Sequence, residues 1–123
     1  MSSGGEARIR GQWGEELVAE DLRRKGWTVV ARNFYCRMGE LDIVAKNERY
    51  LIFVEVKLRK NARFGAACEA VTPLKQRKLM AAAQYYLMCH PTKLQPRFDV
   101  AEVYAPQGVH TERPSISYIE NAF

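Results

Sequence analysis

The chain has 123 residues, of which 19 are Lys or Arg and 14 are Asp or Glu, giving a formal net charge of +5. This length suits one domain, 1–123, with a single core and excludes a multidomain organisation, while the positive charge suits an anionic partner such as nucleic acid. Three widely spaced cysteines argue against a disulfide framework or a zinc site and favour the cytoplasm, and no apolar run is long enough for a membrane span.

A first long helix is predicted over residues 6–25, after about five N-terminal residues that are expected to fray. Gly26 suits a left-handed helix end. The apolar arc of this helix comprises Trp13, Leu17, Val18 and Leu22. Glu15 lies at the edge of that arc and can lean toward a sheet, whereas Glu16 faces water. The spacing alone leaves Glu15 open to two interpretations, an acidic site residue or an ordinary exposed helix acid.

A strand is predicted over residues 27–35, followed by a hairpin of two strands over 39–45 and 50–59. Residues 46–49 form the short polar break between the two hairpin strands. Side chains alternate faces along a strand, so Glu55, Lys57 and Arg59 share one side of the second hairpin strand. If the loop has an even length, Asp42 lies on the same face as Glu55, as a direct or diagonal neighbour.

Two carboxylates and one ammonium group on an otherwise apolar hairpin are typical of a divalent-metal phosphodiesterase. Mg²⁺ or Mn²⁺ prefers oxygen ligands, and Asp42 and Glu55 would supply them, with Glu15 as a third. Lys57 would orient the attacking water and offset the charge that develops. The alternative is a salt-bridge ladder on a solvated sheet face.

Basic residues then follow the hairpin in two groups. Arg59, Lys60 and Arg63 belong to a segment over residues 59–65 that could grip a phosphate backbone or could be an ordinary solvated connection. A second long helix should begin at Pro73, with Thr72 as its N-cap. Lys75 and Lys78 lie in its first turns, where positive charge is disfavoured unless an external anion compensates, so they are also candidate phosphate contacts.

Two more strands are predicted over residues 97–105 and 115–119. With the three earlier strands they give an α/β fold in which a mixed central sheet of about five strands is flanked by the two long helices. The first three strands should form an antiparallel meander, with the catalytic face opening under the first helix. Asp99 could brace a site residue or make a contact at a strand end.

Two motifs, 37–45 (RMGELDIVA) and 53–59 (FVEVKLR), give the chain its resemblance to the YraN-like family of small bacterial proteins. That family belongs to the restriction-endonuclease-like superfamily and is similar to archaeal Holliday-junction resolvases. The resemblance covers nearly the whole chain, and Leu41-Asp42 takes the place of the superfamily's Pro-Asp pair. It implies a restriction-endonuclease-like core, with Asp42, Glu55 and Lys57 in the metal-binding and catalytic positions and Glu15 as the helical acidic residue.

The expected function is therefore metal-dependent hydrolysis of DNA phosphodiester bonds by an endonuclease-like protein, in branched or otherwise structured DNA. The alternative is a nucleic-acid-binding module that has the nuclease fold without useful turnover. Carboxylates facing a polyanion give a pure binder no advantage, which favours the nuclease. A homodimer is a further expectation, because similar resolvases cut paired strands symmetrically.

Overall fold

The computed structural model describes residues 3–60 and 71–123. Its elements follow in the order α1 (Ser3–Arg24), β1 (Thr28–Cys36), β2 (Gly39–Lys46), β3 (Tyr50–Arg59), α2 (Pro73–Cys89), β4 (Gln95–Tyr104), the short 3₁₀ helix η2 (Gly108–His110) and β5 (Ser115–Ile119). None of the helices in these described ranges is both long and apolar enough to span a membrane.

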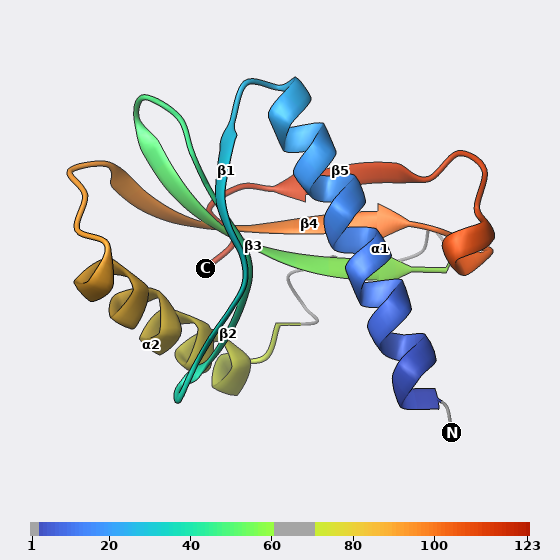
Figure 1. Cartoon of the computed structure of the whole chain (residues 1–123), viewed down its shortest axis with the longest axis horizontal. Helices are drawn as coiled ribbons and strands as arrows, with labels where there is room; N and C mark the ends of the chain where they lie inside the picture. The colour runs from blue at the N-terminus through green and yellow to red at the C-terminus, as the bar shows by residue number, and fades with distance from the viewer. Residues whose placement is uncertain (1–2, 61–70) are drawn as a thin grey trace.

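The five strands form one mixed sheet in the order β1-β2-β3-β4-β5 (Figure 1). The strand pairs are antiparallel except β3 and β4, which run parallel. A parallel pair needs a crossover connection, and α2 lies within the segment that joins β3 to β4. The predicted α/β fold, with a five-stranded mixed sheet, two long helices and an antiparallel meander of the first three strands, is confirmed.

Each long helix covers one face of the sheet. On the α1 face, apolar side chains of the helix pack on alternate residues of the strands, with a buried cluster that includes Val18, Leu22, Ile43, Ile52 and Val54. On the α2 face, a second cluster includes Val44, Leu51, Phe53, Leu79 and Tyr86. The alternation predicted for the second hairpin strand therefore divides β3 between two separate cores.

Two glycines set the position of α1. Gly26 adopts a φ of 98° just after the helix, where the Trp27 N–H donates to the Leu22 carbonyl at 2.9 Å and the Gly26 N–H donates to Arg23 at 3.1 Å. These two bonds form a Schellman motif, which favours glycine. Earlier in the helix, a Cβ on Gly14 would come within 2.5 Å of the Leu58 side chain. Gly14 therefore lets α1 approach β3 closely, next to Glu15.

The hairpin of β1 and β2 bends away from β3, so that its tip lies beside the start of α2 (Figure 1). The bend coincides with an irregularity in β2. Residues two apart on a regular strand share a face, but here Leu41 packs in the α2 cluster and Ile43 in the α1 cluster. Opposite Asp42 lies Asn33, which has a left-handed φ of 52° within β1. The strand pair is therefore strongly twisted at the position of Asp42.

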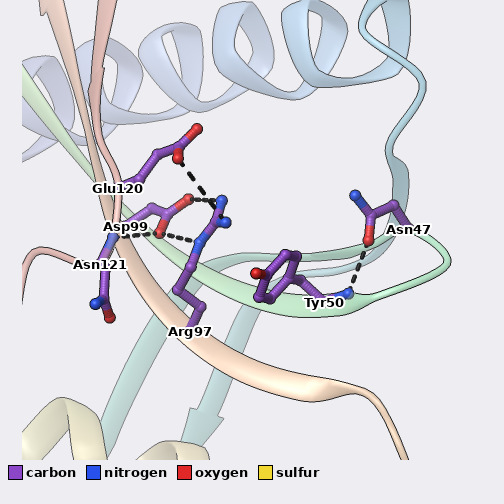
Figure 2. A network of polar contacts seen from close by, with 6 residues as sticks. All are labelled: Asn47, Tyr50, Arg97, Asp99, Glu120 and Asn121. Atoms are coloured by element: carbon purple, nitrogen blue, oxygen red, sulfur yellow. Dashed lines mark hydrogen bonds and ion pairs between the residues drawn. The ribbon is translucent and has the colours of Figure 1, made fainter.

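Asp99, for which two roles were predicted, contacts the end of the chain. Its carboxylate accepts two hydrogen bonds from the Arg97 guanidinium, at 2.9 and 2.8 Å, and one from the Asn121 N–H at 3.0 Å (Figure 2). The same guanidinium lies over the Tyr50 ring, 4.6 Å from its centroid. Asp99 thus makes the predicted strand-end contact, which fixes the residues after β5.

Candidate functional site

The candidate site lies where the ladder between β2 and β3 ends. The pairs of opposite residues in β2 and β3 run from Lys46↔Leu51 to Ile43↔Val54. In the same register the next residues, Asp42 and Glu55, fall opposite each other. This confirms the predicted even register of the hairpin. Asp42 and Glu55 also line one small cavity of about 10 Å³, whose other walls include Phe53 and Leu79.

Asp42 occupies the point at which the two strands separate. Its Oδ2 accepts a hydrogen bond from the backbone N–H of Val56 at 2.9 Å. The side chain thus satisfies a main-chain donor of β3 where the strand pairing is lost. The bond fixes the direction of the Asp42 carboxylate relative to β3.

Three carboxylates from two elements meet at this point. Glu15 of α1 and Glu40 and Asp42 of β2 each contribute an oxygen, and the three oxygens lie within 4.8 Å of one another. This spacing is compatible with shared coordination of one cation by oxygen ligands. Glu40 was not among the predicted ligands, whereas Glu55, which was, is not in this group. The three residues are called the acidic cluster below.

Glu15 is the most deeply buried member of the acidic cluster. The residue is 8% exposed, and its Oε1 has no hydrogen-bond partner among the described residues. Arg32 Nη2 lies 3.9 Å from Oε1, but the guanidinium pairs through its other terminal nitrogen with the exposed Glu16. The interpretation of Glu15 as an ordinary exposed helix acid is therefore wrong, and the predicted choice of Glu15 over Glu16 as the inward carboxylate is confirmed.

The surroundings of Asp42 and Glu15 disfavour negative charge on these two carboxylates. Burial, followed by the nearby Glu55 carboxylate, raises the pKa of Asp42 to about 8. Burial also raises the pKa of Glu15, and a hydrogen bond from the Asn33 side chain opposes that increase. Crowded carboxylates of this kind are stabilised by a cation, because it removes both the desolvation cost and the mutual repulsion.

Glu55 is held by two lysines. Its Oε2 lies 3.5 Å from Lys57 Nζ on the same strand and 3.5 Å from Lys75 Nζ in the first turn of α2. The structure thus brings Lys57 next to Glu55, and it adds a lysine from α2. Because Phe53 and Leu51 on this face of β3 pack with α2, the expectation that the catalytic face opens under the first helix is wrong for Glu55.

The residues predicted to contact phosphate differ in exposure and in pairing. Arg59 donates to Glu102 of β4 at 3.0 Å, while Lys60 is exposed at the end of β3. Arg63 lies outside the described residues. Thr72 caps α2 as predicted, accepting from the Lys75 N–H at 3.1 Å. Lys78 is exposed one turn further on.

A cavity of about 410 Å³ opens beside the acidic cluster. Its lining combines two of the clustered carboxylates with polar groups of α1 and β1, and comprises Arg8, Gly11, Gln12, Glu15, Asn33, Tyr35 and Glu40. Tyr35 is 71% exposed, so its ring is available at this rim. Glu40, Asn33 and Tyr35 were missed by sequence reasoning, although the alternation of β2 already placed Glu40 on the face of Asp42.

Comparison with known proteins identifies the family. Residues 14–103 match the model of the uncharacterised protein family UPF0102. The chain is 43% identical over 117 residues to a UPF0102 protein of Caldicellulosiruptor saccharolyticus, covering 94% of this chain and 98% of the relative. It is 44% identical over 117 residues to a UPF0102 protein of Syntrophomonas wolfei, with the same two coverages, and 50% identical over 94 residues to one of Syntrophotalea carbinolica, covering 76% of each.

The chain therefore belongs to the UPF0102 family. This confirms the resemblance to the YraN-like proteins and to the restriction-endonuclease-like superfamily. The matched region contains all three residues of the acidic cluster, together with Glu55 and Lys57. The names of the relatives state no specific activity. Membership of the family supports a nuclease-like fold and nothing finer.

Proposed function

For this member of the UPF0102 family, we propose a divalent-metal-dependent nuclease that hydrolyses DNA phosphodiester bonds, in branched or otherwise structured DNA. The observation that carries the proposal is the acidic cluster, in which three carboxylate oxygens from α1 and β2 lie within 4.8 Å of one another. A purely structural acidic group would be expected to have its buried oxygens hydrogen-bonded, and within residues 3–60 and 71–123 Glu15 Oε1 has no hydrogen-bond partner.

The residues present fit a hard cation. The acidic cluster offers only oxygen ligands, which suit Mg²⁺ or Mn²⁺ and disfavour softer metals. In the proposal Glu15, Glu40 and Asp42 hold the ion, and Glu55 contributes from the β3 side with two lysines balancing its charge. When bound, the metal would supply a polarised phosphoryl group and a more acidic water.

Lys57 is proposed to orient the attacking water. Its ammonium group lies 3.5 Å from the Glu55 carboxylate, which restrains the long side chain and limits where it can donate a hydrogen bond. An ammonium at this place also offsets the negative charge that builds up on the phosphoryl oxygens during attack. Lys57 would therefore act on the reaction and not on metal affinity.

The lysines at the start of α2, one of which pairs with Glu55, support an anionic substrate. Lys75 and Lys78 stand in the first turns of α2, where the backbone N–H groups and the helix dipole also favour phosphate. A net charge of +5 adds a long-range attraction for nucleic acid. These residues would position the phosphate backbone and carry no sequence information.

The test is a cleavage assay on labelled four-way junction, flap, duplex and single-stranded DNA, with single-stranded RNA included, in Mg²⁺, Mn²⁺ or EDTA. Wild type should cut at least one structured DNA only with metal, and Asp42→Asn should not. Glu15→Gln should reduce cleavage, while the matched change Glu20→Gln on the exposed side of α1 should not. Tight binding by wild type without cleavage of any substrate would contradict the proposal and favour a binding module.

A further inference from the structure

A second cavity, distinct from the one beside the acidic cluster, lies at the end of β3. It measures about 420 Å³ and is an open cavity bounded by α1, the residue after β3 and the η2 turn. Its lining residues include Ile9, Arg10, Lys60, Val109 and His110. At 100° per residue along α1, Ile9 and Arg10 face away from the side that carries Glu15. The two cavities therefore flank α1 on different sides.

The lining of this cavity combines donors with an apolar wall. Arg10, Lys60 and His110 supply groups that can donate to a phosphate, and no acidic side chain is among the described residues that line it. Ile9, which is 59% exposed, adds an apolar surface together with Val109. A phosphate-binding group beside an apolar wall matches a nucleotide, which has an anion at one end and a flat ring at the other.

The turn that forms one wall is held in place by hydrogen bonds. The Gln107 N–H donates to Thr111 Oγ1 at 2.9 Å, and the Ala105 N–H donates to the Arg59 carbonyl at 2.7 Å. Gly108 adopts a φ of 60°, and a Cβ there would lie 3.9 Å from Arg10 Cδ. The cavity is thus preformed, and its volume lies in the range of about 300–1,000 Å³ that is usual for ligand pockets.

The distance from the acidic site suits a continuing nucleic-acid strand. Glu55 lies opposite Asp42 of the acidic cluster, and Lys60 follows Glu55 by five residues along the same extended chain, which corresponds to about 16 Å at roughly 3.3 Å per residue. A strand that rises about 3.4 Å per base would cover this distance in about five nucleotides. The two sites can therefore contact one molecule at the same time.

We propose that this second cavity binds an unpaired nucleotide of the nucleic acid whose phosphodiester is cut at the acidic cluster. The inference rests on the proposed function and narrows its substrate class to DNA with a single-stranded arm. A base that is paired within a duplex cannot enter a cavity of this size, whereas an unpaired base can. Arg10 and Lys60 would bind the phosphate, and the base would lie against Ile9 and Val109.

Binding without metal tests this separately from catalysis. In EDTA, the affinity of the full chain is measured by fluorescence anisotropy for a labelled duplex with a single-stranded arm and for the same duplex with blunt ends. Wild type should prefer the armed duplex. Arg10→Ala and Lys60→Ala should each weaken binding of the armed duplex about threefold to tenfold and lower the salt slope by about 1, with little effect on the blunt duplex.

Two further variants complete the design. Val109→Glu places a negative charge in the cavity wall and should remove the preference for the arm, with circular dichroism as a check on folding. Lys93→Ala is the matched control, because residues 90–94 join α2 to β4 at the opposite end of the sheet from η2 (Figure 1), and it should bind like wild type.

The outcomes are distinguishable. If Arg10→Ala and Lys60→Ala keep the preference for the arm while Asp42→Asn abolishes cleavage, the cavity assignment is overturned and the proposed function stands. If AMP shifts the amide resonances of Val109 but does not compete with the armed duplex, the cavity takes a free nucleotide and the strand assignment is wrong. If neither duplex binds to wild type, the proposed function and this inference fail together.

Discussion

Two buried carboxylates of this chain, Asp99 and Glu15, are accommodated in opposite ways. Asp99 is 2% exposed and accepts three hydrogen bonds, two of them from one guanidinium (Figure 2). Glu15 is 8% exposed, has one oxygen that accepts no hydrogen bond from the described part of the chain, and lies beside two other carboxylates. A buried acid with all its partners is satisfied within the fold, and removing a partner is costly. A buried acid that has an oxygen without a hydrogen bond and lies among other carboxylates costs stability and calls for a functional reason.

The comparison predicts that the largest effect of any substitution falls on catalysis at the acidic cluster. Asp42→Asn and Glu40→Gln preserve volume and remove a charged ligand, so each should reduce metal-dependent cleavage roughly 100-fold to 1,000-fold, or about 3–4 kcal/mol of barrier. DNA binding in EDTA should be unchanged or tighter. Single-turnover cleavage with anisotropy on the same preparations measures both, and equal activity of wild type and Asp42→Asn would mean a different site.

The next largest effect is a loss of stability on breaking the pair of Arg97 and Asp99. Asp99→Ala leaves the Arg97 guanidinium without its main partner and should lower the free energy of unfolding by about 3 kcal/mol, the low end for a broken buried pair because Glu120 remains nearby. The double variant Arg97→Met/Asp99→Leu should recover part of this loss. Urea unfolding measures these changes. A loss below about 1 kcal/mol would show that the Arg97–Asp99 pair contributes no more to stability than a surface ion pair.

A smaller change in the free energy of unfolding, and one that stabilises the fold, is expected for Asp42→Asn in the absence of metal. The pKa of Asp42 is raised to about 8 in the folded chain, so the folded state binds more protons than the unfolded state and loses stability as pH rises from about 4 to about 8. Asp42→Asn lacks this loss and should be more stable than wild type in EDTA by roughly 1–2 kcal/mol at about pH 9. Urea unfolding at about pH 5 should show a smaller difference, and a difference independent of pH would contradict the assignment.

The smallest expected effect sharpens the role of Asn33. Asn33→Gly keeps a residue that tolerates the left-handed φ of 52° but removes the amide near Glu15, whereas Asn33→Ala also strains the backbone. Both should raise the metal concentration needed for half-maximal cleavage, and Ala alone should cost about 1 kcal/mol of stability relative to Gly. Asn33→Gly with an unchanged metal requirement would show that Asn33 serves only the turn of the strand.

Local patterns predicted much of the fold. The alternation of residues in the two hairpin strands and the even loop between them fixed the register of Asp42 and Glu55, and Thr72 with Pro73 predicted the start of α2. The position of Glu15 at the edge of an apolar arc indicated that it turns inward. These features depend on neighbours in sequence, which a pattern can show.

The rest of the site depends on contacts between distant segments. Glu40 joins Asp42 and Glu15 because β2 twists where the hairpin separates from β3, and that twist accompanies the left-handed Asn33 on the neighbouring strand. Lys75 reaches Glu55 only because the crossover brings α2 to the same face. The cavity at η2 is lined by three segments, at residues 9–10, at Lys60 and at residues 106–110, and each is about 50 positions from the next in sequence. No local periodicity encodes such a combination.

Direct measurement of Mn²⁺ binding by electron paramagnetic resonance tests the central claim, that the three carboxylates of the acidic cluster form a metal site. The account predicts bound Mn²⁺ in wild type and in the control Glu20→Gln, with affinity reduced about tenfold or more in Asp42→Asn and Glu40→Gln. Circular dichroism would confirm that the variants are folded. Equal Mn²⁺ affinity in wild type, Asp42→Asn and Glu40→Gln, or no binding by folded wild type, would contradict it.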